Sequence, residues 1–498
     1  MESLYKKYVA YCQELQDIGS ALSLMSWDQE VMMPTGGAAF RSRQIATLAG
    51  IKHEKQTSNE FSDILQELSV DGKDLNWEQK KNVELSLKSI NKAKKFPKSF
   101  IQEFSQLRSE AFQSWLKSRE ENDFTVFSPD LERLVEKARE QTEILGYPEQ
   151  RYDALIDNYD PGTTTKKLEE VFTQVKEQLV PFYQSLLEAE SPDNSFMFNH
   201  FEDAKQWDFG VELLKQMGYD FNHGRQDKAP HPFSISFSNE DSRVTTRIDE
   251  ENFTDMTWST IHEGGHALYE MGLLKENYGL PSGTSTSLSI HESQSRLWEN
   301  NVGRSLAYWK ANYSRLQALF PDNLGSVSLN DFYRGMNKVQ PSLIRVDADE
   351  LSYHLHILVR FEMEKALLDR EIEVREAADA WVEKYRKYLA IDVPDDKSGV
   401  LQDIHWSHGS FGYFPTYSLG SFYAAQFFNQ ASKNIPGLED QIAKGEMDQL
   451  LQWLKEGIHK HGMLYNSEEL CKRVTGEGLN FQYFMDYVGS KYREIYNV

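Results

Sequence analysis

Two histidines and a glutamate near the middle of the chain have the residue types and the spacing of a metal site. They lie in the segment His262-Glu263-Gly264-Gly265-His266. Residues four positions apart share one face of a helix, so both imidazoles can bind the same metal ion. The carboxylate of Glu263 follows the first histidine and could take a proton from a water molecule beside that ion. This H-E-x-x-H pattern is typical of zinc peptidases.

Two other interpretations of the segment are a chance match and an ordinary pair of histidines on a helix surface. Gly264 and Gly265 favour the metal site over both. A glycine inside a helix costs about 1 kcal/mol relative to alanine. We therefore expect another part of the chain to approach the backbone closely at this point.

A catalytic zinc ion takes three protein ligands and leaves one position open for water. Cys12 and Cys471 are the only cysteines, which excludes a site built from thiolates. A third histidine at the spacing of the metzincins would occupy position 272, where the chain has Gly272. The third ligand is therefore expected to be a carboxylate.

Three glutamates after the motif were candidates for that carboxylate. Glu270 lies on the predicted metal helix itself, too far along its axis, and Glu276 falls near the helix end. Glu292 follows His266 by 26 residues and lies on a second helix predicted from about Ser287. That length allows the chain to return alongside the first helix. The spacing alone leaves Glu292 open as a metal ligand or as a solvated surface carboxylate.

Arg345 opens a predicted helix that also carries His354 and His356. A guanidinium is unusual there, because the N-terminal end of a helix prefers anions. It would suit a site that binds a carboxylate through two hydrogen bonds. The alternative is a salt bridge to Asp347 or Asp349. The two histidines point to different helix faces and are predicted to be core or interface residues.

A stretch rich in glycine and aromatic residues, 399–417, differs from the rest of the sequence. It contains His405, Tyr413 and Tyr417. These side chains could donate hydrogen bonds to an oxyanion. The alternative is an aromatic core, which is the usual environment of tyrosine.

The remaining sequence predicts the elements that position these residues. Segments rich in Glu, Lys, Gln, Leu and Ala recur between short breaks, for example at 34–37, 97 and 160–162, which predicts a mainly α-helical fold. Alternating apolar and polar residues predict a β-hairpin at about 231–249, directly before a metal helix at about 255–274. Such a hairpin could bind an extended peptide by strand addition, or could simply close the core.

The composition limits the class of partner and the compartment. The net charge of −23 argues against nucleic acid and anionic membranes as partners. No run of 18 apolar residues predicts a membrane span, and residues 1–7 lack the pattern of a secretory signal. Together with only two cysteines, this predicts a cytoplasmic protein. No shift in composition marks a boundary, so we expect one domain over residues 1–498.

The chain resembles the carboxypeptidase Taq family of metallocarboxypeptidases, the thermostable carboxypeptidase 1 type. Most of the resemblance lies within residues 231–420, with a weaker match around Trp27 to Arg41. It rests on six motifs in order: His231-Pro232-Phe233; Asp241 with Arg243 and Thr245; His262-Glu263 with His266; His291-Glu292-Ser293; Ile344-Arg345 with Ala348-Asp349; and Gly399 with Gln402-Asp403 and His405-Trp406.

The resemblance implies a zinc enzyme that removes single amino acids from peptides with a free C-terminus. It implies one zinc ion per chain, which cobalt or manganese could replace. The residue roles that it implies are metal binding by His262, His266 and Glu292; general-base catalysis by Glu263; transition-state donation by His405 and Tyr417; anchoring of the terminal carboxylate by Arg345; and further substrate contacts by His231, Arg243 and Tyr413.

The resemblance also implies a helical zinc-peptidase fold with a deep substrate groove and a homodimer. Residues 1–200 would form a helical wall of the groove, residues 231–420 the catalytic core, and the hairpin part of the groove wall. Two other functions fit the same metal residues. One is a helical zinc endopeptidase or dipeptidyl carboxypeptidase, from which Arg345 would distinguish a carboxypeptidase. The other is an inactive peptide-binding scaffold, which would be expected to lack a metal ligand or the base.

Overall fold

The computed structural model describes residues 2–498, which divide into two compact units. Unit 1 consists of the described residues up to Lys94, Asn194–Met336 and Phe427–Gly478. Unit 2 consists of Lys95–Asp193, Asn337–Gln426 and Leu479–Val498. Each unit combines three separate stretches of chain, so neither corresponds to residues 1–200 or 231–420. The expectation of one domain over the whole chain stays a prediction.

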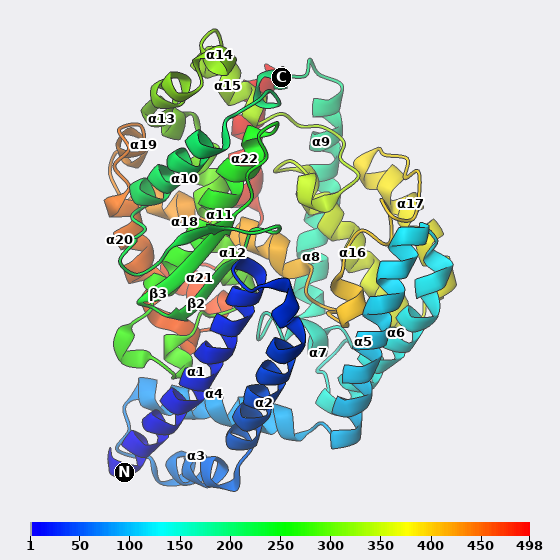
Figure 1. Ribbon diagram of the computed structural model, residues 1–498, viewed down its shortest axis with the longest axis vertical. Helices are drawn as coiled ribbons and strands as arrows, with labels where there is room; N and C mark the ends of the chain where they lie inside the picture. Colours follow the sequence, from blue (N-terminus) through cyan, green and yellow to red (C-terminus); the bar gives the residue numbers. More distant parts are fainter. Residues whose placement is uncertain (1) are drawn as a thin grey trace. The chain divides into compact units, whose positions relative to one another are not determined.

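Unit 1 is mainly helical and contains a small three-stranded sheet (Figure 1). Its longer helices are α1 (Glu2–Val31), α2 (Ala38–Gln56), α3 (Asn59–Asp71), α4 (Trp77–Lys94), α10 (Asp203–Met217), α11 (Phe253–Met271), α12 (Leu288–Arg296), α13 (Leu306–Leu319), α15 (Leu329–Met336), α20 (Asp448–Gly457) and α21 (Ser467–Thr475). A π-helical segment, η6 (Leu297–Gly303), continues α12 directly.

The sheet has the strand order β1-β3-β2. Strand β2 (Ser234–Ser238) pairs with β3 (Asp241–Thr246) in antiparallel fashion, which confirms the predicted hairpin within narrower bounds. Strand β1 (Gln226–Lys228) adds to β3 in parallel and was not predicted, because three residues are too few to show a periodic pattern. Strand β2 is therefore an edge strand.

Helix α11 is the metal helix and packs against α10, α12 and β3. It starts two residues earlier than predicted, because the side chain of Asn252 caps it by accepting from the backbone N–H of Thr254. A Cβ atom on Gly265 would lie 2.6 Å from the Cα of Ser295 in α12. The expected close approach to the glycine backbone is therefore confirmed, and the approaching element is the second helix.

Unit 2 is built from helices that surround one buried helix, α16 (Ser352–Asp369), which is buried along almost its whole length. The others are α5 (Lys98–Glu121), α6 (Phe124–Leu145), α7 (Asp153–Ile156), α8 (Thr165–Gln174), α9 (Val180–Leu187), α17 (Ala377–Leu389) and α22 (Gln482–Tyr496), and α18 (Pro415–Asn434) begins in this unit. In Figure 1, α5 and α6 lie side by side. The predicted breaks at 97 and 160–162 are confirmed by the ends of α4, α5 and α8.

The predicted helix start at Arg345 is wrong. Arg345–Asp347 forms a short 3-10 turn, η7, and α16 begins only at Ser352. The side chain of Asp349 explains the later start. It accepts hydrogen bonds from the backbone N–H groups of Leu351 and Ser352, and so satisfies donors that a helix end leaves free.

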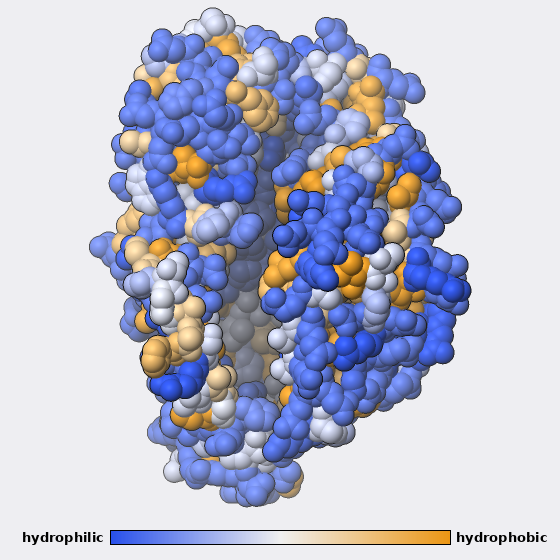
Figure 2. Space-filling model, turned by 45° about the vertical axis from the view of Figure 1, so that its right-hand side comes forward, coloured by the Kyte–Doolittle hydropathy of each residue, from blue (hydrophilic) through white to orange (hydrophobic). Residues whose placement is uncertain are grey.

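Hydrophilic residues cover most of the face shown in Figure 2, as the composition leads one to expect. Across residues 2–498, none of the helices combines the length and the apolar character needed to cross a bilayer. Both cysteines are buried free thiols.

Candidate functional site

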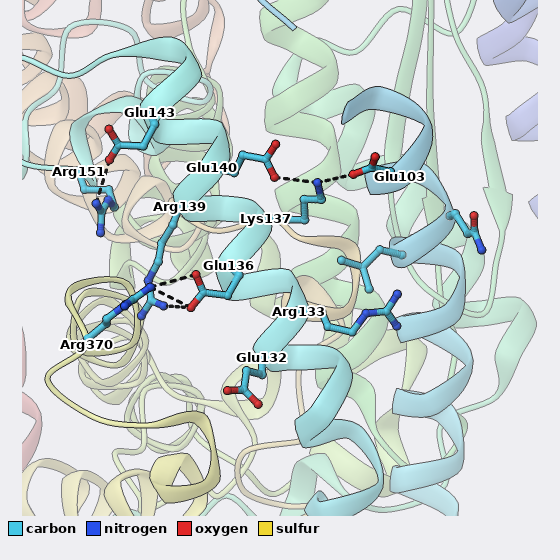
Figure 3. A pocket seen from close by; sticks show the side chains of 12 residues that line it. Glu103, Glu132, Arg133, Glu136, Lys137, Arg139, Glu140, Glu143, Arg151 and Arg370 are labelled. Atoms are coloured by element: carbon cyan, nitrogen blue, oxygen red, sulfur yellow. Dashed lines mark hydrogen bonds and ion pairs between the residues drawn. The ribbon is translucent and has the colours of Figure 1, made fainter. Parts of the chain in front are cut away.

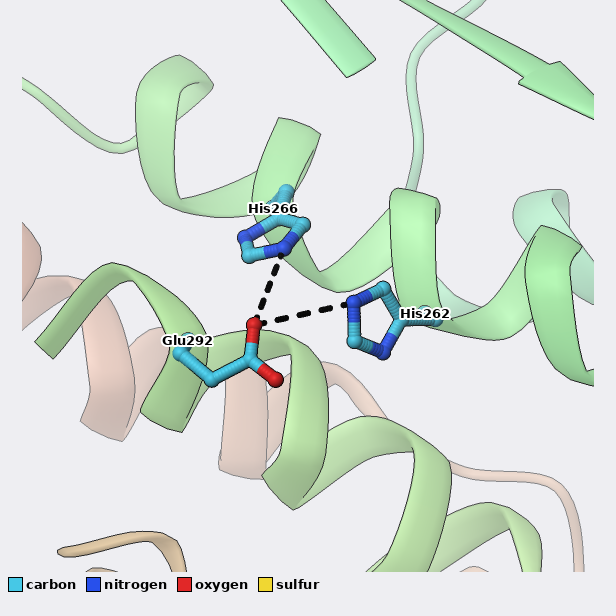
Figure 4. A group of neighbouring side chains, drawn as sticks. All are labelled: His262, His266 and Glu292. Atoms are coloured by element: carbon cyan, nitrogen blue, oxygen red, sulfur yellow. Dashed lines mark ion pairs between the residues drawn. The ribbon is translucent and has the colours of Figure 1, made fainter. Parts of the chain in front are cut away.

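Three side chains of unit 1 converge on one point, and we call them the metal cluster: His262, His266 and Glu292 (Figure 4). The Nε2 atoms of His262 and His266 lie 3.7 and 3.5 Å from Oε2 of Glu292. One candidate ligand atom from each residue falls within 4.8 Å of the others. Two imidazoles and one carboxylate are the donor set of a catalytic zinc site.

Regular backbone geometry brings the cluster together. The two histidines lie one turn apart on α11, and α12 passes beside them at the point where Gly265 removes the side chain between the helices. The hydroxyl of Ser287 caps α12 by accepting from the backbone N–H of Ile290, which fixes where the second helix starts. Glu292 then faces the histidines one turn further on.

A second carboxylate, Glu299, holds the first imidazole in place. Its Oε2 lies 2.8 Å from Nδ1 of His262. A proton on Nδ1 leaves Nε2 with its lone pair free to bind a metal, and such pairing of a histidine ligand is common in metal sites. Glu299 belongs to the π-helical segment η6, and π-helical turns occur often at functional sites.

Two arginines balance these carboxylates. Arg296 donates to Oε1 of Glu292 at 2.7 Å and to Oε2 of Glu299 at 3.1 Å, while Arg304 lies 3.3 Å from Oε1 of Glu299. Burial alone would raise the pKa of Glu292, but Arg296 and His262 hold that pKa well below its usual range. Burial would likewise raise the pKa of Glu299, and Arg296 again outweighs it. Both carboxyls are therefore ionised near neutral pH.

The second histidine has a different environment. Its ring stacks on that of His291 with centroids 4.4 Å apart, and His291 in turn lies 2.9 Å from Glu270. Burial and the neighbouring His291 lower the pKa of His266 to about 3, so its imidazole is neutral, as a metal ligand must be. Glu270 is thus the partner of His291 and lies outside the metal cluster, while Glu276 is exposed.

Glu263 is buried beside the metal cluster on α11. Burial raises the pKa of its carboxyl, although His262 and the hydroxyl of Ser234 partly oppose this. Ser234 is the first residue of the edge strand β2. The outer strand of the sheet therefore begins next to this carboxylate, while further along it the carbonyl of Phe237 accepts a hydrogen bond from Ser20 of α1 at 2.7 Å.

The residues present fit a divalent metal ion. Two imidazoles and one carboxylate leave one position of a four-coordinate zinc ion open for water. Glu299 orients the ring of His262, and Arg296 keeps the carboxyl of Glu292 ionised.

A second group of polar residues lies in unit 2, and we call it the Arg345 cluster: Arg345, Arg360, Gln402 and Asp403. Asp403 pairs with Arg345 through Oδ1 at 3.0 Å and with Arg360 through Oδ2 at 2.6 Å. The side chain of Gln402 accepts from the backbone N–H of Arg345 and from Arg360. Arg345 therefore does form a buried salt bridge, but its partner is Asp403 and neither Asp347 nor Asp349.

The remaining hydrogen-bonding capacity of Arg345 determines what it can still bind. Its Nε and Nη2 face Asp403, and Nη1 donates to the hydroxyl of Tyr353 at 3.1 Å. A guanidinium has five N–H groups, so these contacts leave one on each terminal nitrogen. Arg345 therefore keeps N–H groups with which it can still donate to a carboxylate.

Next to the Arg345 cluster lies what we call the aromatic cluster: His405, Tyr413, Phe414 and Tyr417. Nε2 of His405 lies 3.4 Å from the hydroxyl of Tyr417, and the rings of Tyr413 and Tyr417 are 5.3 Å apart. The ring of Tyr417 lies 5.1 Å from the guanidinium carbon of Arg345. Burial lowers the pKa of His405 to about 4, so its imidazole is neutral near pH 7.

The other candidate residues have separate surroundings. His231 is exposed just before β2. Arg243 pairs with Asp241 at 2.9 Å and lies over the ring of Trp27. His408 is exposed and packs on a phenylalanine ring. His354 and His356 are buried in unit 2, as expected of core residues.

Sequence reasoning gave no role to Glu299, Arg296 or Asp403. The first two were within reach, because Arg296 and Glu299 follow Glu292 by four and seven residues and so return to its helix face. The pairing of Asp403 with Arg345 spans 58 positions, and no local pattern indicates it.

Unit 2 also contains an open cavity of about 1190 Å³ along α5 and α6 (Figure 3). Its lining includes five acidic and five basic side chains, many of them in ion pairs, such as Lys137 with Glu103 and Glu140 at 2.7 Å. The opposite charges offset one another, so the cavity presents no strong field of either sign.

Comparison with known proteins gives one consistent result. The model of the family described as carboxypeptidase Taq (M32) metallopeptidase matches residues 7–492. The thermostable carboxypeptidase 1 of Thermus thermophilus is 39% identical, with 99% of each chain covered. Carboxypeptidase 1 of Bacillus subtilis is 37% identical over 99% of this chain and 98% of its own. The crystal structure of an M32 carboxypeptidase from Deinococcus radiodurans superposes with a TM-score of 0.98 at 37% identity, covering 100% of both chains.

Proposed function

Because the chain belongs to the carboxypeptidase Taq (M32) family of metallopeptidases, we propose that it removes single amino acids from the C-termini of peptides with the help of one zinc ion. The observation that carries this proposal is the metal cluster, in which two imidazoles and one ionised carboxylate converge beside Glu263. Zinc bound there would polarise the scissile carbonyl and lower the pKa of a coordinated water towards about 7. Cobalt or manganese, which favour similar nitrogen and oxygen ligands, could replace it.

Glu263 is the proposed general base. Its buried carboxylate takes the proton of the attacking water and later delivers it to the nitrogen of the leaving amino acid. Ser234, whose hydroxyl opposes the rise in the pKa of this carboxylate, begins the edge strand β2. A peptide that paired with the start of β2 would run past Glu263 in extended form.

His405 and Tyr417 are the proposed donors to the oxyanion that forms on the scissile carbonyl. Both can donate a hydrogen bond while neutral, and the pKa of His405 near 4 keeps its imidazole uncharged at the pH of most cells. Tyr413 lies in the same aromatic cluster and is proposed as a substrate contact. His231 and Arg243 are proposed as contacts further along the peptide.

Arg345 is the proposed anchor of the terminal carboxylate. Asp403 and Tyr353 hold its guanidinium, and its two remaining N–H groups would donate to the terminal carboxylate. The anchor is what would separate a carboxypeptidase from a helical zinc endopeptidase or a dipeptidyl carboxypeptidase. The presence of all three metal-cluster residues and Glu263 argues against an inactive peptide-binding scaffold.

The test compares two ways of removing the same contact. Arg345→Ala acting on a free-acid peptide and wild-type enzyme acting on the amidated peptide should lose about the same activity. Truncating one partner of a buried charged pair costs about 2–5 kcal/mol, which is on the order of 30- to several-thousand-fold in kcat/KM. The combination should be little worse than either change alone, because both remove one interaction.

Release of the C-terminal amino acid, followed by mass spectrometry, gives the readout. Arg345→Lys is the matched control, since it keeps the charge but not the fork, and it should restore only part of the activity. Equal cleavage of acid and amide, or cleavage at internal bonds, would show that the endopeptidase alternative is correct.

We also propose that the protein is a cytoplasmic homodimer that binds neither nucleic acid nor membranes. Two buried free thiols suit a reducing compartment, and the net charge of −23 disfavours polyanionic partners. Light scattering at micromolar concentration tests the dimer, for which a mass near 58 kDa, that of the single chain, would be the contrary result.

A further inference from the structure

A buried carboxyl group in unit 2, Glu364, has no part in the chemistry proposed above. It lies on the buried helix α16, and its side chain is fully shielded from solvent. Three donors surround it. The hydroxyl of Tyr152 donates to Oε2 at 2.6 Å, the backbone N–H of Gly412 donates to Oε2 at 2.9 Å, and the indole N–H of Trp406 donates to Oε1 at 3.0 Å.

Two of these donors are the chain neighbours of candidate functional residues. Trp406 follows His405, and Gly412 precedes Tyr413. Consecutive Cα atoms are about 3.8 Å apart and joined by a planar peptide, so a fixed residue strongly limits the position of the next. One carboxylate therefore ties together both ends of the segment between His405 and Tyr413.

The segment has little freedom to take another path. Gly412 has φ +88, and a Cβ atom there would lie 2.8 Å from the backbone carbon of Leu155 in α7. The same short helix follows Tyr152, the third donor to Glu364. Within the segment, the backbone N–H of Ser410 donates to the carbonyl of His405 at 3.0 Å, which closes the turn.

We propose that Glu364 is a positioning residue that holds the segment from His405 to Tyr413 in the conformation in which His405, Tyr413 and Tyr417 meet. This inference rests on the proposed function, because it assigns Glu364 an effect on catalysis through His405 and Tyr417. A carboxylate is suited to the task, since its two oxygens accept all three hydrogen bonds. A glutamine has only one acceptor oxygen and would turn its amide N–H groups towards one set of donors.

The central test is Glu364→Gln, measured well below its melting temperature. A displacement of a catalytic group by about 1 Å can cost on the order of 10²-fold in rate. We expect kcat to fall by about 10- to 100-fold while KM changes by less than about threefold and metal content stays at the wild-type value. A variant with lower thermal stability but wild-type kcat would show that Glu364 only fills the core, and would overturn the proposal.

Tyr152→Phe is the matched control. It removes a donor to the same carboxylate, but one that is not next to a candidate catalytic residue. At pH 8.5 we expect its kcat to stay within about threefold of wild type, even though a buried hydrogen bond is lost. A fall in kcat as large as that of Glu364→Gln would overturn the proposal, because the effect would then come from general loosening of the core.

A pH profile of kcat provides a readout that remains available if Glu364→Gln does not fold. Burial raises the pKa of Glu364 to about 7, against the hydrogen bonds of its three donors and the charge of Arg360. The titratable and charged groups that face it are Tyr152, Tyr159 and Arg360. Protonation removes an acceptor, so kcat of the wild type should fall as the pH decreases through about 7.

Tyr152→Phe removes a hydrogen bond that lowers the pKa of Glu364, so its acid limb should move to higher pH. An acid limb that is unmoved in Tyr152→Phe would overturn the proposal. His405→Ala and Tyr417→Phe, measured in parallel, distinguish an error in the proposed function from an error in the role of Glu364. If both keep wild-type kcat, the proposed function of these residues is wrong. If both lose activity but Glu364→Gln does not, only the role of Glu364 is wrong.

Discussion

The metal cluster of unit 1 and the aromatic cluster of unit 2 hold their side chains in different ways. His262, His266 and Glu292 lie on two regular helices whose separation is set by one glycine. His405 lies in a 3-10 turn, and Tyr413 precedes the first turn of α18, so both depend on side-chain contacts with distant residues such as Glu364. The first arrangement resists local changes in side chains, while the second depends on each contact that holds its loop.

The largest expected effect separates metal binding from chemistry in the first region. Glu263→Gln keeps the shape of the side chain but cannot accept a proton. We expect turnover to fall by at least about 10²–10⁴-fold, as for loss of a general base, with metal content near wild type. Turnover of peptide and metal per chain should be measured on the same preparation. Near-normal turnover would remove Glu263 from the proposed mechanism.

The next effect concerns the donors of the second region. Tyr417→Phe and His405→Ala should each lower kcat by about 10²–10³-fold with little change in KM, as expected for a lost oxyanion donor. Steady-state kinetics on a short free-acid peptide measures both constants. An increase confined to KM would make the residue a substrate contact, and a lower melting temperature with normal kinetics would favour the aromatic-core interpretation.

A smaller effect tests whether the metal cluster depends on its surrounding carboxylate. Glu299→Gln weakens the hydrogen bond that orients the ring of His262. Loss of such a contact to a metal ligand costs about 10- to 100-fold in metal affinity. Competition with a coloured chelator measures the dissociation constant for zinc. Glu270→Gln is the control, because Glu270 partners His291 and no metal-cluster residue, and its affinity should stay within about threefold of wild type. Equal losses in both variants would contradict the assigned role of Glu299.

The smallest expected effect is a difference in the free energy of unfolding between variants of the two glycines in α11, Gly264 and Gly265. A Cβ atom on Gly265 would meet backbone atoms of α12, whereas one on Gly264 would meet the flexible end of Leu214 at 2.7 Å. Gly265→Ala should destabilise the protein by about 1–3 kcal/mol through overpacking, beyond the gain of about 1 kcal/mol in helix propensity. Gly264→Ala should be nearly neutral. Denaturant unfolding of both variants checks this, and equal stability would show that the helices can separate without cost.

These two regions also differ in how far the sequence predicts them. Most helices follow from their periodicity, and the start of α12 follows the predicted position near Ser287, which caps it. The spacing of His262 and His266 predicts a shared face, because helical geometry repeats over short distances. Glu292 was left open by spacing and was assigned through the family resemblance, since the path of the chain between two helices has no such regularity.

The second region was predictable only as a set of residue types. Two contacts hold it in place: Arg345 pairs with Asp403, 58 positions away, and Trp406 donates to Glu364, 42 positions away. The contacts form when the tertiary fold is complete, and nothing in the local sequence records them. The error in the start of α16 has the same origin. Asp349 could equally have paired with Arg345, and only the folded chain shows that it caps the helix.

The π-helical segment η6 makes the metal site sensitive to insertions and deletions in this stretch of chain. Glu292 and Glu299 face the same histidine only because a fixed number of residues separates them along α12 and η6. Deleting Leu297 would turn the following residues by about 100° around the helix axis and carry Glu299 away from His262. Length changes among related chains should therefore accumulate in loops and spare this stretch, so a gap-free alignment here would be a criterion for a working metal site.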